Sequence, residues 1–158
     1  MSLRIGSQVQ TVSRRARILS AAADKPRIVV VAGALLDEQG RVLIAARPPG
    51  KHMAGRWEFP GGKIADGESP ETALRRELRE ELGIEVRRCR LEMSLVHAYP
   101  DREVELLFHV VESWSGTPES LEGQALRWVP IAALGDEDIL EADLPFIRTL
   151  QRHVGSAR

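Results

Sequence analysis

The stretch GKIADGESPETALRRELREELGI, which runs from Gly62 to Ile84, decides the fold of this chain. It predicts a helix over Ser69–Leu82, because a serine at the N-cap accepts hydrogen bonds from the free backbone amides of the first turn. Pro70 suits the first helical position, where an amide hydrogen has no partner in the helix. Gly83 follows the last turn and is the expected C-cap. The segment therefore predicts one helix with both of its ends marked.

Charged and apolar side chains separate on this predicted helix. At about 100° per residue, one arc carries three carboxylates, those of Glu77, Glu80 and Glu81. A second arc is apolar and suits docking on a sheet; it consists of Leu74, Leu78 and Leu82. Arg75 and Arg79 fall on the side away from the acids.

Three carboxylates so close together favour a bound cation. Like charges three or four residues apart destabilise a helix by roughly 0.2–0.5 kcal/mol per pair, and a divalent ion would reverse that effect. Mg²⁺ and Mn²⁺ prefer such oxygen ligands. A solvated acidic face balanced by arginines is the alternative for a bare acidic helix. Gly61-Gly62 and Glu68 favour the metal, because the two glycines permit close approach of the backbone just before the helix.

Segments rich in β-branched residues lie on both sides of this helix. Arg27–Leu36 and Arg41–Ala46 are predicted strands around a turn at residues 37–40, and we expect them to pair as a hairpin. Leu91–Tyr99 and Glu103–Trp114 predict a second hairpin. The remaining elements are an extended piece at Trp57–Pro60, a strand at Leu126–Val129 and a closing helix at Leu144–His153. This mixture predicts an α+β fold in which a mixed β-sheet is sandwiched between helices.

The composition indicates one soluble domain. The chain has 158 residues, of which 43% are hydrophobic and 28% are charged, enough for a real core and a solvated surface. We expect the domain at residues 27–153, between an N-terminal extension at 1–26 and a tail at 154–158. The net charge of -1 gives no global field for nucleic acid but leaves room for a small polyanion. No apolar run approaches the roughly 20 residues that a membrane span needs.

Residues 1–23 differ from the rest of the chain, because they contain Arg4, Arg14, Arg15 and Arg17 and no acidic residue. This composition is typical of an organelle-targeting presequence. A plain extension is the favoured interpretation, because the segment lacks a sustained apolar face. We therefore expect a cytoplasmic protein, either a monomer or a homodimer.

Cys89 is the single cysteine, so the chain has no intrachain disulfide. Its neighbours Arg88 and Arg90 could lower the pKa of the thiol, but no histidine and asparagine pattern accompanies it. We interpret Cys89 as a structural residue.

The Gly62–Ile84 segment resembles the Nudix box, whose pattern is G-x5-E-x7-R-E-U-x-E-E-x-G-U with U a bulky aliphatic residue. All of the fixed positions are filled, by Gly62, Glu68, Arg76, Glu77, Leu78, Glu80, Glu81, Gly83 and Ile84. The resemblance implies a Nudix fold and metal-dependent hydrolysis of a phosphorus anhydride. It also implies Mg²⁺ as the cofactor, for which Mn²⁺ can substitute.

From about Val29 to Leu150 the chain is similar to the MutT branch of this family. The similarity is carried by HMAGRWEFPGGKIADGE at His52–Glu68, YPDR at Tyr99–Arg102 and LEGQ at Leu121–Gln124. It implies conversion of 8-oxo-dGTP to 8-oxo-dGMP and pyrophosphate, which sanitises the nucleotide pool and avoids mutations. The partner would be a small nucleotide, with neither nucleic acid nor a membrane involved directly.

The resemblance also implies roles for single residues. The metal would be held by the Gly61 carbonyl and by the carboxylates of Glu68, Glu77, Glu80, Glu81 and Glu122. Arg76 would orient a box glutamate, and Glu122 is a candidate for activating water, although the choice of general base among the glutamates stays open. A solvated loop position is the alternative for Glu122.

Five further residues would contact the nucleotide. Arg47 and His52 match residues that touch the nucleotide, and Phe59 and Tyr99 match aromatic positions around the base. A solvated loop residue is the alternative for His52, and a plain core residue is the alternative for Phe59.

Asp143 departs from the MutT pattern, which has an asparagine here to read the guanine edge. An ionised aspartate only accepts hydrogen bonds, from the cytosine amino group or from guanine N1–H and N2–H. A related branch, the CTP pyrophosphohydrolases, carries aspartate in a similar run, so CTP, dCTP or 5-methyl-dCTP is the alternative substrate. Asp143 could also cap the last helix. Two remoter alternatives are a catalytically idle Nudix ligand sensor and an enzyme acting on ADP-ribose or dinucleoside polyphosphates.

Overall fold

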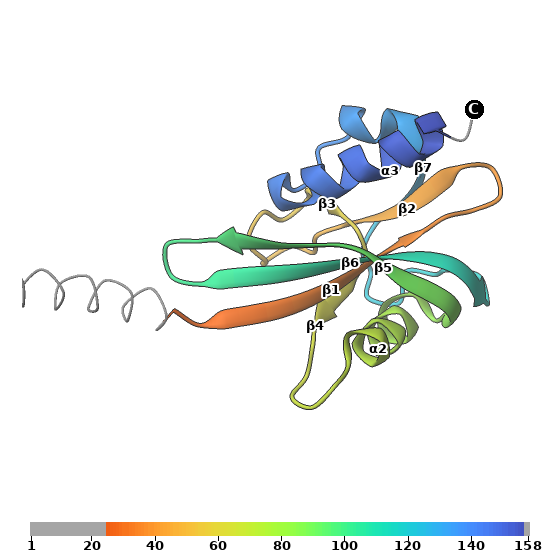
Figure 1. Ribbon diagram of the computed structural model, residues 1–158. Coiled ribbons are helices and arrows are strands. Elements are labelled where there is room, and N and C mark those ends of the chain that lie inside the picture. Colours follow the sequence, from red (N-terminus) through yellow and green to blue (C-terminus); the bar gives the residue numbers. More distant parts are fainter. Residues whose placement is uncertain (1–24, 157–158) are drawn as a thin grey trace, which may run out of the picture.

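The computed structural model describes residues 25–156, whose strands form two sheets (Figure 1). The four-stranded sheet has the order β4-β1-β6-β5, with β1 at Arg27–Leu35, β4 at Gly61–Lys63, β5 at Glu85–Ala98 and β6 at Glu103–Ser115. This sheet is mixed, because β1 and β6 run parallel while its other pairs are antiparallel. The second sheet is antiparallel and has the order β3-β2-β7, with β3 at Trp57–Glu58, β2 at Arg41–Ala46 and β7 at Leu126–Pro130.

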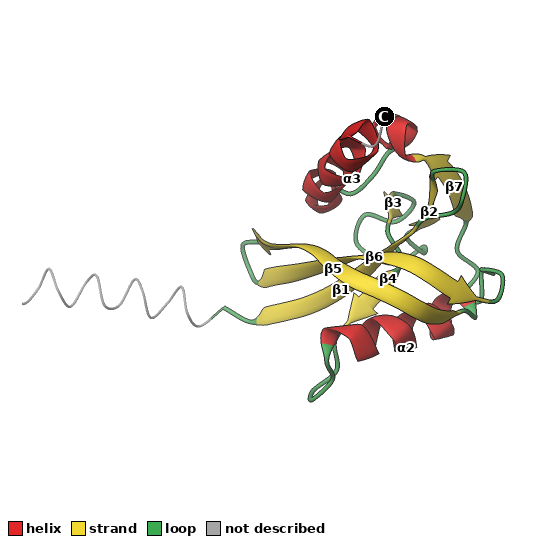
Figure 2. Cartoon of the chain, turned by 45° about the vertical axis from the view of Figure 1, so that its right-hand side comes forward, coloured by secondary structure: helices red, strands yellow, loops and turns green. Residues whose placement is uncertain are grey.

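Two helices lie on opposite sides of the four-stranded sheet (Figure 2): α2 at Pro70–Leu82 and α3 at Leu144–Ser156. Because successive side chains of a strand point to opposite faces, β1 and β6 supply both cores. One core joins Val31 and Val111 to the leucines of α2, and the other joins Ala32 and Phe108 to Phe146 of α3. The predicted α+β sandwich is therefore confirmed.

The predicted pairing of the first two strands is wrong. The turn at residues 37–40 forms, with the Asp37 carboxylate accepting from the amides of Gln39 (3.0 Å) and Arg41 (2.8 Å). Beyond it, however, β1 and β2 share only the Leu36–Val42 bridge and enter different sheets. Both edges of β1 are already occupied by β4 and β6, so no edge is left for β2. A strand apolar on both faces does not reveal which neighbours it will take.

The second hairpin and the other elements agree with the prediction, although β5 begins at Glu85 and α3 continues to Ser156. Short 3-10 segments at Ile131–Asp136 and Glu141–Asp143, η1 and η2, lead into α3. No helix within residues 25–156 is long and apolar enough to cross a membrane. Most of the predicted extension at residues 1–26 lies outside the described residues.

Cys89 is half-buried on β5, and burial raises the pKa of its thiol. The neighbouring Arg88 and Arg90 do not contribute to this shift, and the lowering effect of Arg75 is outweighed by burial. A thiol held in its neutral form is a poor nucleophile, which supports a structural role for this cysteine.

Candidate active site

The two ends of α2 are fixed as the sequence predicts. The Ser69 hydroxyl accepts from the Thr72 amide (3.2 Å), and Pro70 occupies the first turn. Gly83 adopts a left-handed conformation (φ 69°) and its amide donates to the Arg79 carbonyl (3.0 Å). Leu74, Leu78 and Leu82 are all fully buried against the sheet, so the acidic arc of α2 must face the β4 side of the molecule.

The glycine pair before α2 lies in direct contact with the glutamates of the helix. The Gly61 amide donates to the Glu81 carboxylate (3.2 Å). A Cβ atom on Gly62 would lie 2.4 Å from the Glu77 carboxyl carbon, and a Cβ atom on Gly61 would lie 1.9 Å from the Val31 carbonyl oxygen. Neither position has space for a side chain, so the close approach expected of these glycines is realised.

Arg76 holds three of the acids that the sequence places in the site. Its guanidinium donates to both oxygens of Glu68 (2.7 and 2.8 Å), to Glu77 (2.9 Å) and to Glu80 (3.4 Å). It also donates to the Lys63 carbonyl of β4 (3.1 Å). Hydrogen bonding to Arg76 lowers the pKa of Glu68 to about 2. Arg76 therefore connects the helix, the loop before it and strand β4.

Glu81 has the opposite environment, since no cation contacts it among the interactions of the described residues. Burial, together with the charges of Glu77, Glu122 and Glu58, raises the pKa of Glu81 to about 8, against the hydrogen bond from Gly61. A carboxylate next to other carboxylates is costly to ionise. The acidic cluster is therefore a place where a positive charge would be stabilised.

The loop at residues 116–125 brings Glu122 next to Glu81 by means of backbone contacts. The Leu121 amide donates to the Glu81 carbonyl (3.1 Å), and the Gln124 side-chain amide donates to the same carbonyl (3.4 Å). Gln124 in turn accepts from the Glu122 amide (3.1 Å). Glu122 itself is exposed, so its carboxylate can reorient toward the cluster.

Only some of the residues expected to bind metal lie close to one another. Glu77, Glu81 and Glu122 lie within electrostatic reach of one another, whereas both oxygens of Glu68 are engaged by Arg76 and Glu80 has a 55% exposed side chain. Within residues 25–156, no three acidic, histidine or cysteine groups already converge on one point. The donor set nevertheless suits a hard divalent cation, because it offers carboxylate and carbonyl oxygens around an unbalanced negative charge.

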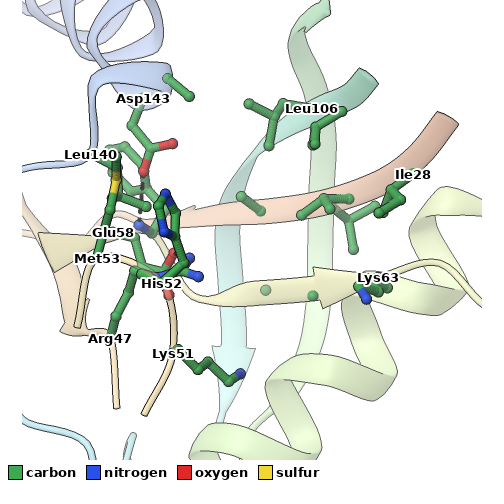
Figure 3. Close-up of a pocket in the computed structure, with 18 of the residues that line it drawn as sticks. Ile28, Arg47, Lys51, His52, Met53, Glu58, Lys63, Leu106, Leu140 and Asp143 are labelled. Atoms are coloured by element: carbon green, nitrogen blue, oxygen red, sulfur yellow. Dashed lines mark hydrogen bonds and ion pairs between the residues drawn. The ribbon is translucent and has the colours of Figure 1, made fainter. Parts of the chain in front are cut away.

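A cavity of about 380 Å³ opens beside Gly61 and Gly62 and extends to Asp143 (Figure 3). It is lined by all five residues expected to contact the nucleotide: Arg47, His52, Phe59, Tyr99 and Asp143. Figure 3 shows a polar side, with Arg47, Glu58 and Asp143, and across from it an apolar side with Ile28 and Leu106. An elongated ligand could thus place an apolar ring at one end and an anionic chain near the glycines.

Arg47 and Phe59 line the cavity, and each also contacts neighbouring residues that hold its side chain in place. Arg47 donates to the His52 carbonyl (2.8 Å) and forms an ion pair with Glu58 (2.9 Å). The Phe59 ring is buried in edge-on contact with Phe146, at a centroid distance of 5.1 Å. Phe59 is thus a core residue that also borders the cavity, and the two interpretations of it are compatible.

Asp143 is the most enclosed acid of the cavity, with an exposed fraction of 6%. Burial, together with the nearby charge of Glu58, raises its pKa to about 7. Its carboxylate accepts from the Phe59 amide at 3.4 Å, in the direction of the cavity. Although Asp143 immediately precedes α3, this contact joins it to the β3–β4 connection and not to its own helix.

Two residues of the cavity escaped the sequence analysis. Arg102 stacks over the Tyr99 ring at 5.1 Å, and its Nε is the one buried side-chain nitrogen or oxygen of the described chain that lacks a hydrogen-bond partner. Glu58 is enclosed between Arg47 and Asp143, and burial raises its pKa. Two features of the sequence could have indicated them: Glu58 is a charged residue between the aromatic residues Trp57 and Phe59, and Arg102 ends the YPDR segment.

The fold and the site together define an α+β protein in which an acidic helix borders a half-apolar cavity. The NUDIX domain family matches residues 26–150, and the chain belongs to this family of hydrolases.

Known proteins are similar over most of their length. The chain is 39% identical over 126 residues to the 8-oxo-dGTP diphosphatase of Escherichia coli K12, covering 80% of this chain and 98% of that protein. It is 36% identical over 121 residues to the CTP pyrophosphohydrolase of the same organism, covering 77% and 90%. The solution structure of the E. coli ORF135 protein superimposes with a TM-score of 0.75 at 34% identity, covering 86% and 96%.

Proposed function

We propose that this Nudix hydrolase converts a nucleoside triphosphate, with 8-oxo-dGTP as the preferred substrate, into the monophosphate and pyrophosphate. The observation that carries the proposal is the continuity of the cavity with the acidic cluster. Gly61 and Gly62 line the cavity on one side and contact Glu81 and Glu77 on the other. A triphosphate whose base lies near Asp143 would therefore extend its phosphates toward the glutamates.

The charges along the cavity support this orientation. Arg47, Lys51 and Lys63 line it, and cations along the path of a polyphosphate offset the negative charge of that chain. Arg102 also lines the cavity, where its guanidinium lies over the Tyr99 ring at 5.1 Å and adds a further positive charge. In this proposal Arg47 and His52 bind phosphate, while Tyr99, Arg102 and Asp143 surround the base.

Mg²⁺ would be held by the Gly61 carbonyl, Glu77, Glu81 and Glu122, and it would supply charge neutralisation and polarisation of the phosphoryl oxygens. Arg76 would keep Glu77 and Glu80 aimed at that position, and Glu68 would in turn hold Arg76. A carboxylate within reach of the attacking water can accept its proton. Glu81 and Glu122 lie within electrostatic reach of each other, so both are candidates for this role.

The test is a nucleotide screen with product identification. Purified protein is incubated with 8-oxo-dGTP, dGTP, dCTP and CTP, with Mg²⁺ or with EDTA, and nucleoside monophosphate and pyrophosphate are quantified. We expect equal amounts of both products, the highest kcat/KM with 8-oxo-dGTP, and no turnover in EDTA. In H₂¹⁸O, attack at the β-phosphorus would place the label in pyrophosphate. Release of orthophosphate, or turnover without a divalent cation, would contradict the proposal.

Cytidine triphosphates are the second candidate, and Asp143 is the observation that favours them. A carboxylate accepts from the cytosine amino group, and one relative of the chain is named CTP pyrophosphohydrolase. The raised pKa of Asp143 is also compatible with the purine candidate, because a protonated carboxyl both donates and accepts, as the asparagine of the MutT pattern does.

Asp143→Asn separates the two candidates. If 8-oxo-dGTP is preferred through a protonated Asp143, the ratio of kcat/KM for 8-oxo-dGTP to that for dCTP should change less than about threefold at pH 6 and rise in the variant at pH 8.5, where the wild-type carboxyl is ionised. A wild-type preference for dCTP that collapses in Asp143→Asn would establish the cytidine alternative.

A further inference from the structure

The loop at residues 47–56, between β2 and β3, is closed at its base and carries Met53 near its tip. Backbone hydrogen bonds join the Arg47 amide to the Arg56 carbonyl (2.9 Å) and the Gly55 amide to the Arg47 carbonyl (3.0 Å). A further bond from the Arg56 amide to the Met53 carbonyl (3.3 Å) forms a tight turn. The loop is therefore a compact unit whose parts move together.

Met53 is held in an unfavourable backbone conformation at this tip. Its φ of 59° makes it the one non-glycine residue of the described chain in the left-handed region. A long side chain adopts this region only where surrounding contacts impose it, and such positions concentrate at ligand-binding sites. Its side chain is also 39% exposed, yet it lines the cavity. An apolar, partly exposed thioether at a cavity wall has unused contact surface.

Arg56 ties Met53 to the segment that leads to Asp143. Its guanidinium donates to the Ile139 carbonyl (2.9 Å) and to the Asp138 carboxylate (3.2 Å). The same guanidinium lies 3.9 Å from the Met53 sulfur. One side chain thereby fixes the distance between the loop tip and residues 138–143.

Met53 and the strands form two facing walls. Figure 3 shows Met53 next to Leu140 on the side of Asp143, with Leu106 and Ile28 across the cavity. The space between an apolar sheet floor and a polarisable thioether suits a flat aromatic ring, because sulfur makes favourable contacts with aromatic rings at about 5 Å. In the proposed function, the phosphate end of the cavity is at Gly61 and Gly62.

We propose that Met53 is the outer wall of the nucleobase slot and a specificity-determining residue, and that Arg56 is the positioning residue that sets the width of this slot. The inference rests on the proposed function, because it assumes that a base occupies the Asp143 end. A purine extends further across the slot than a pyrimidine does, so it gains more from Met53. Met53 should affect nucleotide binding and not the rate of the chemical step, because in the proposed function the bond that breaks lies at the glycine end of the cavity.

The test compares Met53→Ala with the rescue variant Met53→Leu, which restores an apolar wall of similar size. We expect Met53→Ala to raise KM for 8-oxo-dGTP about tenfold, to raise KM for dCTP less than about threefold, and to leave kcat within about twofold. Met53→Leu should return most of the lost purine affinity. Equal changes in KM for both bases, or a change confined to kcat, would overturn the assignment of Met53.

Arg56 is tested by a double-mutant cycle. If Arg56 acts through Met53, the fold-increase in KM of the double variant should be smaller than the product of the fold-increases caused by Arg56→Ala and Met53→Ala alone. Arg127→Ala is the matched control, because Arg127 pairs with Glu137 at 2.8 Å on the neighbouring segment but does not line the cavity. It should leave KM unchanged. Multiplicative effects of Arg56→Ala and Met53→Ala would show that Arg56 does not position Met53.

Calorimetric binding of the monophosphates 8-oxo-dGMP and dCMP separates this inference from the proposed function. Neither measurement requires catalysis. We expect Met53→Ala to weaken 8-oxo-dGMP binding more than dCMP binding even if the triphosphates prove to be poor substrates. If the wild type releases pyrophosphate from triphosphates but Met53→Ala leaves the ratio of the two affinities unchanged, the proposed function stands and the wall is refuted. If the wild type binds neither monophosphate, there is no nucleobase slot at this position.

Discussion

The Gly61–Gly62 end and the Asp143 end of the cavity each contain a carboxylate whose pKa is raised mainly by burial, but the two carboxylates have different neighbours. At the glycine end, Glu81 is near Glu77 and Glu122, and the cluster suits an external cation. At the other end, Asp143 is almost completely buried beside Glu58, and its raised pKa of about 7 is caused mainly by desolvation. The first end favours a metal ion, whereas the second favours a proton.

This difference between the two ends of the cavity suggests that one end serves the reaction and the other serves recognition of the base. An acidic cluster that requires a cation can act on any phosphate chain, irrespective of the base attached to it. A buried carboxyl that keeps its proton presents a donor and an acceptor to one edge of a base. The glycine end would therefore determine which bond is cut, and the Asp143 end would determine which nucleotide is chosen.

Apart from loss of the Glu81 charge, the largest expected effect comes from adding one methyl group at the glycine end. Gly62→Ala places a Cβ atom 2.4 Å from the Glu77 carboxyl carbon, so Glu77 must move. We expect kcat to fall about 100-fold or more, since small displacements of catalytic groups are this costly, with little change in the base preference. Steady-state kinetics measure it, and circular dichroism checks folding.

Gly135→Ala is the matched control for this change, because a Cβ atom at Gly135 meets nothing within 4 Å. It should keep wild-type kinetics. If Gly62→Ala is as active as Gly135→Ala, the position of Glu77 has no catalytic importance.

A smaller loss is expected from Arg76→Ala. The variant releases Glu68, Glu77 and Glu80 together, and loss of a residue that orients metal ligands typically costs between about 10-fold and 100-fold. The concentration of Mg²⁺ that gives half-maximal rate should rise as well, which a loss of stability alone would not produce. Arg75→Ala is the control, because Arg75 pairs with Glu71 away from the site. A Mg²⁺ dependence that is the same in both variants would remove Arg76 from the site.

The smallest effect on activity, and a measurable one on stability, is expected at the other end. The folded pKa of Asp143 is about 7 against 3.8 for the free side chain. Between these values the folded protein holds a proton that the unfolded chain has lost, so the free energy of unfolding falls as pH rises through this window. Asp143→Asn has no carboxyl to lose a proton, so its free energy of unfolding does not fall in this way. The difference in free energy of unfolding between the variant and the wild type should therefore grow from pH 4 to pH 7, to at most roughly 4 kcal/mol. Urea unfolding at pH 4.5, 6 and 8 measures it, and an advantage independent of pH would contradict the raised pKa.

The glycine end could be predicted from the sequence because its determinants are contiguous. The cap at Ser69, the stripe from Leu74 to Leu82 and the acids of α2 follow from helical spacing alone, and all of them lie where that spacing places them. The contact of Arg76 with Glu68 crosses the helix start and was suggested only by the family resemblance.

The Asp143 end could not be derived in the same way, because its residues come from distant parts of the chain. Glu58, Arg102 and Asp143 meet only after β3, β6 and η2 are packed together. The wrong pairing of β1 with β2 has the same origin, since the edges of β1 are taken by strands that lie far away in sequence. The sequence of a buried strand does not by itself indicate which strands pair with it.

The most direct test of the central claim is the rate of pyrophosphate release by Glu81→Gln at saturating Mg²⁺, with the best triphosphate of the screen. This change keeps the shape of the side chain and its acceptor for the Gly61 amide, but removes the negative charge. The account predicts a loss of at least about 1,000-fold in kcat, with the affinity for 8-oxo-dGMP retained. Turnover within a few-fold of the wild type would show that the acidic cluster of α2 is not where the phosphate chain is cut.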